Sequence, residues 1–94
     1  MKNKIDLRLV SYRVFNDLIG NLYPRGSVIP GYNISNPFLS HQQKTPSFNV
    51  FKAKDGTLIY KDFATGDKGN CISFIQKLRG ITIKETIKYI KNVI

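Results

Sequence analysis

The first twenty residues carry two overlapping hydrophobic patterns that predict different elements. Residues 5–9 alternate between apolar and charged side chains, which is the period of a short strand. In that interpretation Ser11 caps a helix that ends near Gly20. The alternative is one continuous helix over residues 5–20, and both interpretations place a helix over residues 11–20. The apolar positions that align along the longer helix are Leu7, Val10, Val14 and Leu18.

Residues 21–47 contain all four prolines of the chain, together with two glycines. Proline and glycine at this density predict turns instead of long regular elements. Short strands fit only near Ser27–Ile29 and Tyr32–Ile34.

A β-hairpin is the clearest local signal in the sequence. Ser47–Lys52 and Thr57–Phe63 are both rich in β-branched and aromatic residues, and Lys54-Asp55-Gly56 lies between them. Asp-Gly between two such runs predicts a hairpin turn. Gly66, Lys68 and Gly69 then predict a loop.

Two helices are predicted after this loop. Asn70 can cap a helix that runs to Arg79 and is stopped by Gly80. The run Thr82-Ile83-Lys84-Glu85 forms a capping box for a last helix. That helix carries an apolar stripe (Ile83, Ile87, Ile90 and Ile94) beside a basic stripe (Lys84, Lys88 and Lys91).

Composition limits the class of protein. A chain of 94 residues makes one domain, so we expect a single unit over residues 1–94. No apolar run reaches the roughly 20 residues of a membrane span, and no signal peptide is evident, so we expect a cytoplasmic protein without a membrane partner. The single cysteine excludes an internal disulfide, and with one histidine it excludes a conventional Cys/His zinc site.

The formal net charge of +9 indicates a polyanionic partner. The excess is denser in the second half: residues 44–94 carry ten basic and four acidic side chains, against five and two in residues 1–43. A lysine-rich solvated surface is the alternative interpretation, because net charge by itself favours only non-specific attraction.

Two stretches, His41–Val50 and Tyr60–Phe74, resemble the N-terminal zinc-binding domain of bacterial and phage replicative primases. The first contains Lys-Thr-Pro-Ser-Phe and the second Gly-Asn-Cys-Ile-Ser-Phe, at compatible spacing. Gly80 and Glu85 also stand where that family has a glycine and an acidic residue. The resemblance covers residues 12–92. It implies an α+β fold, in which a small antiparallel sheet is flanked by an N-terminal helix and two C-terminal helices.

The sequence departs from this family at its four zinc ligands. Three positions are occupied by Asn36, Asp62 and Thr65, and the fourth keeps His41, shifted by two residues. Asparagine and threonine are poor zinc ligands, so we predict a degenerate domain without zinc and without any other cofactor. Hydrogen bonds among Asn36, Asp62 and Thr65, with Phe38 and Phe63 packed nearby, are expected in place of the metal.

The resemblance implies a role in primer synthesis, in which the domain binds the single-stranded template. No catalytic constellation is recognisable, so we expect a non-enzymatic accessory domain of a partner DNA polymerase, primase or helicase. It is either a natural small protein of a phage or mobile element, or a piece of a larger primase. Basic side chains along a backbone and aromatic platforms for bases are typical of single-strand binding. The predicted contacts are Lys44, Lys52, Lys54, Lys61, Lys68, Arg25, Phe51 and Tyr60, while Phe48, Phe63 and Phe74 are assigned to the core.

Partner docking is assigned to the apolar residues Leu9, Tyr12 and Ile19 of the N-terminal segment. Two alternatives stay open. One is a pure protein-interaction module of a replication complex. The other is a small regulator that binds duplex DNA through Lys84, Lys88 and Lys91.

Overall fold

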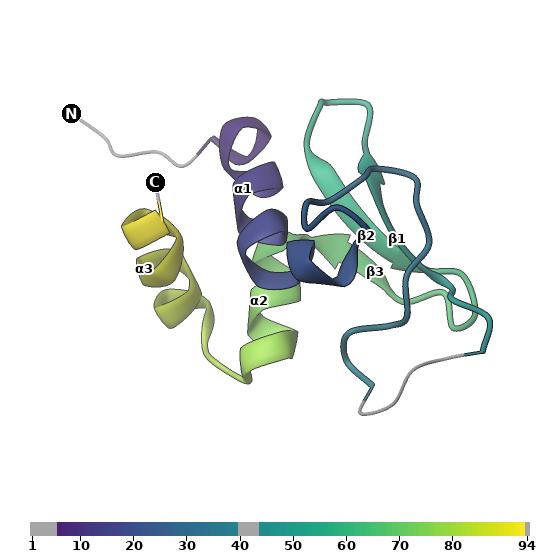
Figure 1. Ribbon diagram of the computed structural model, residues 1–94. Helices are drawn as coiled ribbons and strands as arrows, with labels where there is room; N and C mark the ends of the chain where they lie inside the picture. Colours follow the sequence, from purple (N-terminus) through teal and green to yellow (C-terminus); the bar gives the residue numbers. More distant parts are fainter. Residues whose placement is uncertain (1–5, 40–43, 94) are drawn as a thin grey trace.

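A computed structural model describes residues 6–39 and 44–93 of the chain, and it confirms the predicted α+β architecture (Figure 1). Helix α1 (Leu7–Ile19) is followed by a short 3₁₀ turn, η1 (Gly20–Leu22). Strands β1 (Phe48–Lys52), β2 (Leu58–Asp62) and β3 (Lys68–Asn70) form one antiparallel sheet in the order β1-β2-β3. Helices α2 (Cys71–Arg79) and α3 (Ile83–Val93) follow.

Helices α1 and α2 cover one face of the sheet, where both contact β2, and α3 packs on the far side of this helical pair. The prediction of a short strand over residues 5–9 was wrong for the described residues, because α1 already begins at Leu7. The Asp6 carboxylate accepts a hydrogen bond from the Arg8 backbone N–H at 3.0 Å and caps the helix. Ser11 is instead buried within α1, where its hydroxyl accepts from the Leu58 N–H.

The hairpin was predicted correctly. Val50 pairs with Tyr60 in the β1–β2 ladder. Gly56 sits in the connecting turn with φ of 88°, a conformation that glycine adopts without strain. The Asp55 carboxylate accepts from the Thr57 N–H at 2.9 Å and stabilises the turn.

Two of the predictions for irregular segments were wrong. Residues 68–70 form β3, where a loop was predicted, and Gly69 pairs with Tyr60. Of the strands predicted near Ser27–Ile29 and Tyr32–Ile34, the described residues form only an isolated bridge between Ile34 and Phe48.

Both C-terminal helices begin as predicted, and α2 also ends as predicted. The Asn70 side chain accepts from the Ser73 N–H at 3.0 Å, and Gly80 ends α2 in the left-handed conformation. Thr82 and Glu85 form the reciprocal capping box of α3, with N–H to side-chain oxygen distances of 2.9 and 3.1 Å.

The core is built around stacked aromatic rings that α1, α2 and the sheet enclose. Phe48 and Phe74 are fully buried, as predicted, whereas Phe63 is 59% exposed and its assignment to the core was wrong. The Phe48 ring stacks on Tyr60 with centroids 5.4 Å apart, and Phe38 meets Phe74 at 5.3 Å. No helix among the described residues is long and apolar enough to cross a membrane.

Candidate nucleic-acid interface

The face of the sheet turned away from α1 and α2 gathers basic and aromatic side chains. Successive strand residues point to opposite faces, and Phe48, Val50, Leu58 and Tyr60 point into the core. The alternate positions therefore define the outer face of the sheet. Its residues are Asn49, Phe51, Ile59, Lys61 and Lys68, and the register pairs Lys61 with both Asn49 and Lys68.

Phe63 extends this outer face beyond the end of β2. The Lys61 ammonium lies 5.1 Å from the centroid of the Phe63 ring, within cation–π range. Phe63 was assigned to the core from the sequence, as the last residue of the run Thr57–Phe63. Alternation places residues 61 and 63 on one face but does not say whether that face is buried or exposed.

The other predicted basic contacts are exposed but more dispersed. Lys52 ends β1 and Lys54 lies in the hairpin turn, so both are at the opposite end of the hairpin from Phe63. Lys44 belongs to the segment that leads into β1, and the Ser47 carbonyl accepts a hydrogen bond from the Phe63 N–H at 2.9 Å. Lys44 therefore precedes β1 at the end of the hairpin where Phe63 lies. Arg25 is exposed in the irregular segment after η1.

Two predicted site residues are buried, and their assignments are corrected. Tyr60 is 2% exposed and packed between Phe48 and Phe74, so its ring cannot receive a base. Ile19 is also 2% exposed, because it closes the core at the end of α1, and it cannot dock a partner. Leu9 and Tyr12, at 78% and 43% exposed, remain available on α1.

A buried polar network is centred on Asp62 and includes Asn36, two of the residues that the sequence resemblance assigned to ligand positions. The Asn36 amide donates to Oδ2 of Asp62, and Oδ1 accepts from the Ser47 hydroxyl at 2.7 Å and the Ala64 N–H at 2.8 Å. The side-chain oxygen of Asn36, Oδ1, accepts a hydrogen bond from the Phe38 N–H at 2.7 Å. The contact predicted between Asn36 and Asp62 is thus formed.

Thr65 does not join this network through its hydroxyl, which accepts from the Asp67 N–H at 3.2 Å. His41 lies outside the described residues. Burial raises the pKa of Asp62, but the hydrogen bonds from Ser47, Asn36 and the backbone outweigh burial, so the pKa is lowered overall. The carboxylate is therefore charged at neutral pH.

The chain belongs to the CHC2 zinc finger family, whose model matches residues 21–94. It is similar to the DNA primase of Clostridium acetobutylicum, with 40% identity over 60 residues, which is 64% of this chain and 10% of that protein. It is 35% identical over 77 residues to the DNA primase of Buchnera aphidicola and 34% identical over 77 residues to that of Listeria monocytogenes. Each of these two matches covers 82% of this chain and 12% of the primase, and no solved structure matches significantly. The family connects the chain to DNA replication.

The described residues at the family's ligand positions do not fit zinc. Structural zinc sites are built from thiolates and imidazoles, and these positions offer an amide, a carboxylate and a hydroxyl. Asn36 and Asp62 also satisfy each other and neighbouring donors by hydrogen bonds. The described part of the chain contains no group of three or more His, Cys, Asp or Glu side chains that could hold a metal ion. The side-chain oxygens of Asn36 and Asp62 are thus already hydrogen-bonded within the protein.

Proposed function

We propose that this domain binds single-stranded DNA template and assists primer initiation by a partner that carries the catalytic site. The observation that carries the proposal is the outer face of the sheet, where Lys61, Lys68 and Phe63 lie together in a member of a primase domain family. Lysines that follow the backbone and an exposed aromatic ring that can stack on a base are the two components of single-strand binding.

The placement of these side chains on a sheet favours a single strand over a duplex. Sequence readers of duplex DNA insert a helix or a ribbon into the major groove. Lys68 and Phe63 are instead exposed on one face of a sheet, with Lys61 between them, where unstacked bases can reach them. Phe51, half-buried beside Ile59, extends the apolar part of the same face.

We infer that the catalytic step belongs to a partner polymerase or primase, and a helicase is a further candidate for a binding partner. The chain spans about a tenth of the length of the primases it matches. In this proposal the domain raises the rate of initiation by positioning template, which lowers the entropic cost of bringing reactants together. The proposed docking residues are the exposed Leu9 and Tyr12 on α1. A partner bound there would leave the outer face of the sheet free for DNA.

Fluorescence anisotropy with single-stranded oligonucleotide and duplex of the same sequence tests the proposal. We expect tighter binding to the single strand. Replacing both Lys61 and Lys68 by alanine should reduce the affinity for the single strand. The slope of the logarithm of the binding constant against the logarithm of the salt concentration should become shallower by about 0.7 for each phosphate that the variant no longer neutralises. Lys91→Ala, an exposed lysine on α3, is the matched control and should change neither.

Two results would point to the other functions. Tighter binding to duplex, abolished by Lys84→Ala and Lys88→Ala on α3, would make the protein a duplex-binding regulator. Binding to neither nucleic acid, with retained binding to a replication protein, would make it a protein-interaction module.

A further inference from the structure

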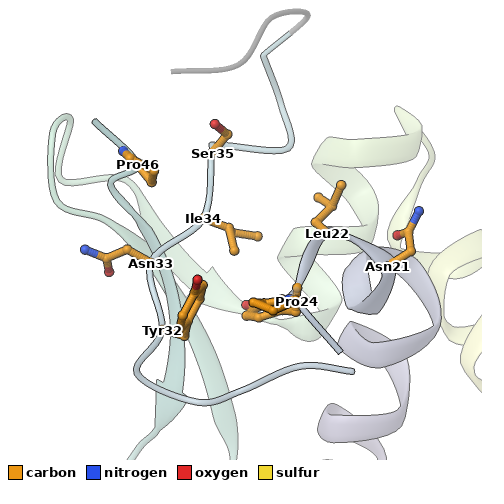
Figure 2. A pocket seen from close by; sticks show the side chains of 9 residues that line it. Asn21, Leu22, Pro24, Tyr32, Asn33, Ile34, Ser35 and Pro46 are labelled. Atoms are coloured by element: carbon orange, nitrogen blue, oxygen red, sulfur yellow. The ribbon is translucent and has the colours of Figure 1, made fainter. Parts of the chain in front are cut away.

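A second feature lies away from the outer face of the sheet: a cavity of about 430 Å³ between the end of α1 and the segment before β1. Figure 2 shows Tyr32 and Ile34 on one side of it and Leu22 and Pro24 on the other. The volume is in the range of small-ligand sites. The side chains of Asn21 and Asn33 point away from its centre in Figure 2, and Leu22, Pro24, Tyr32 and Ile34 supply apolar surface in its lining.

One wall of the cavity is an aromatic ring that is free to stack. Tyr32 is 45% exposed, and its ring lies 6.1 Å from that of Tyr23 at an angle of 50°. A flat ligand that enters between Tyr32 and the side chains of Leu22 and Pro24 would gain stacking on one side and apolar contact on the other.

Tyr23 supplies a polar group without a partner. It lines the cavity and is 3% exposed, and its hydroxyl has no hydrogen-bond partner among the described residues. A buried hydroxyl without a partner destabilises the fold. The Tyr23 hydroxyl is closed off from the cavity in the unbound structure, so a ligand acceptor reaches it only when neighbouring side chains shift, and the bond that then forms removes this cost. Carbonyl oxygens and ring nitrogens of nucleobases are acceptors of this kind.

The charge around the cavity favours an anionic ligand. No acidic side chain is among the residues that line it. Arg25 follows Pro24 directly, and Lys44 stands two residues before Pro46, which also lines the cavity. Both side chains are exposed and stand within two residues of the lining, so cations are available to the phosphates that flank a bound base.

We propose that this cavity binds one unstacked nucleobase of a single-stranded nucleic acid, with Tyr32 as the stacking surface and the Tyr23 hydroxyl as a hydrogen-bond donor. The inference rests on the proposed single-strand binding and adds a base-specific pocket to it. Proteins that read single strands place splayed bases in this way, stacked on aromatic rings and bonded along their edges.

The test compares two ligands of equal charge: an oligothymidylate of about ten nucleotides and an abasic strand of the same length. Tyr32→Ala should weaken binding of the oligothymidylate at least about fivefold and leave the abasic strand unchanged, because stacking on an aromatic ring contributes this much per base. Tyr32→Phe should retain the affinity. Ile83→Ala is the matched control, since Ile83 is 57% exposed on α3, away from the cavity.

Tyr23→Phe separates ligand binding from folding. Because the hydroxyl has no partner among the described residues, its removal should leave the melting temperature unchanged or raise it. The same variant should weaken oligothymidylate binding without affecting the abasic strand. A purely structural tyrosine would not change the ratio of the two affinities.

The outcomes distinguish this inference from the proposed function. If Tyr32→Ala and Tyr23→Phe both leave the ratio of oligothymidylate to abasic affinity unchanged, while alanine at Lys61 and Lys68 weakens both ligands, the cavity is not a base site and single-strand binding stands. If the wild-type protein binds neither ligand, both proposals fail.

Discussion

Asp62→Asn is the substitution that tests most directly whether side-chain hydrogen bonds hold the fold at the positions that the family resemblance assigns to zinc ligands. The change keeps the size of the side chain but replaces one carboxylate oxygen by an NH₂ group. Oxygen at Oδ1 can still accept from Ser47 and Ala64. The new amide nitrogen then faces the amide nitrogen of Asn36, so two donors meet. Rotating the Asn36 amide would relieve this clash only by losing the bond from the Phe38 N–H.

The free energy of unfolding should fall by about 3 kcal/mol. A hydrogen bond to a charged group contributes about 1.5–3 kcal/mol, and a buried donor left unpaired costs about 1–3 kcal/mol. Asp62 and Asn36 are 2% and 8% exposed, so water screens little of this. For a domain of this length each kcal/mol lowers the melting temperature by about 4–8 °C, which gives a decrease of roughly 12–24 °C.

The assay is thermal unfolding followed by circular dichroism. Asp17→Asn, on the exposed side of α1, is the matched control and should change the stability by less than about 0.5 kcal/mol. Asn36→Asp should be severely destabilising because it makes two carboxylates face each other. The double variant Asn36→Asp with Asp62→Asn exchanges donor and acceptor and should recover much of the stability, which a double-mutant cycle measures.

Two further conditions complete the test. A zinc chelator should leave the melting temperature unchanged. The pKa of Asp62 is lowered in the folded state, so its stabilisation is present above the unfolded pKa and is lost as pH falls through the folded value. The difference in melting temperature between wild type and Asp62→Asn should therefore shrink below about pH 4. Equal melting temperatures for the two proteins at neutral pH, or unfolding by the chelator, would refute the reasoning.

Two other predictions concern packing and docking. In Gly69→Ala the new Cβ would lie 2.2 Å from the Ser73 hydroxyl, so we expect a loss of about 1–2 kcal/mol by thermal unfolding, which Ser73→Ala in the same chain should partly restore. An unchanged melting temperature for Gly69→Ala would contradict the close approach of β3 and α2. Leu9→Asp, at a side chain that is 78% exposed, should leave the fold intact but abolish pull-down of the catalytic partner, and unfolding of this variant would place Leu9 in the core.

The helices and the hairpin were predictable because their signals are local. Each helix cap depends on residues only a few positions apart in the sequence. The structure forms all of the predicted ones, at Asn70, Gly80 and the Thr82–Glu85 box. β3 could not be predicted in this way. It contains a glycine and no β-branched residue, and it pairs with β2 only because the turn after Asp62 brings it there.

The candidate site was predictable in its residue types but not in its exposure. Alternation along β2 predicts two faces but does not say which face the helices cover. Tyr60 and Phe63 were therefore assigned to the wrong sides, since the face that carries Tyr60 packs against α1 and α2. The cavity beside Tyr32 could not be predicted either, because it forms between segments that no sequence pattern brings together.

The position of Cys71 has a consequence for the behaviour of the protein under oxidative stress. Zinc sites built on cysteine thiolates are vulnerable to oxidants, because the exposed thiolate is the species that reacts. Here the only cysteine of the sequence is fully buried, and burial raises the pKa of its thiol to about 11. At neutral pH only about one molecule in ten thousand carries the thiolate. With Asn36 and Asp62 in place of thiolate ligands, the part of the chain that the structure describes presents no reactive thiolate to peroxide, so its architecture should persist under conditions that dismantle a cysteine-ligated zinc finger.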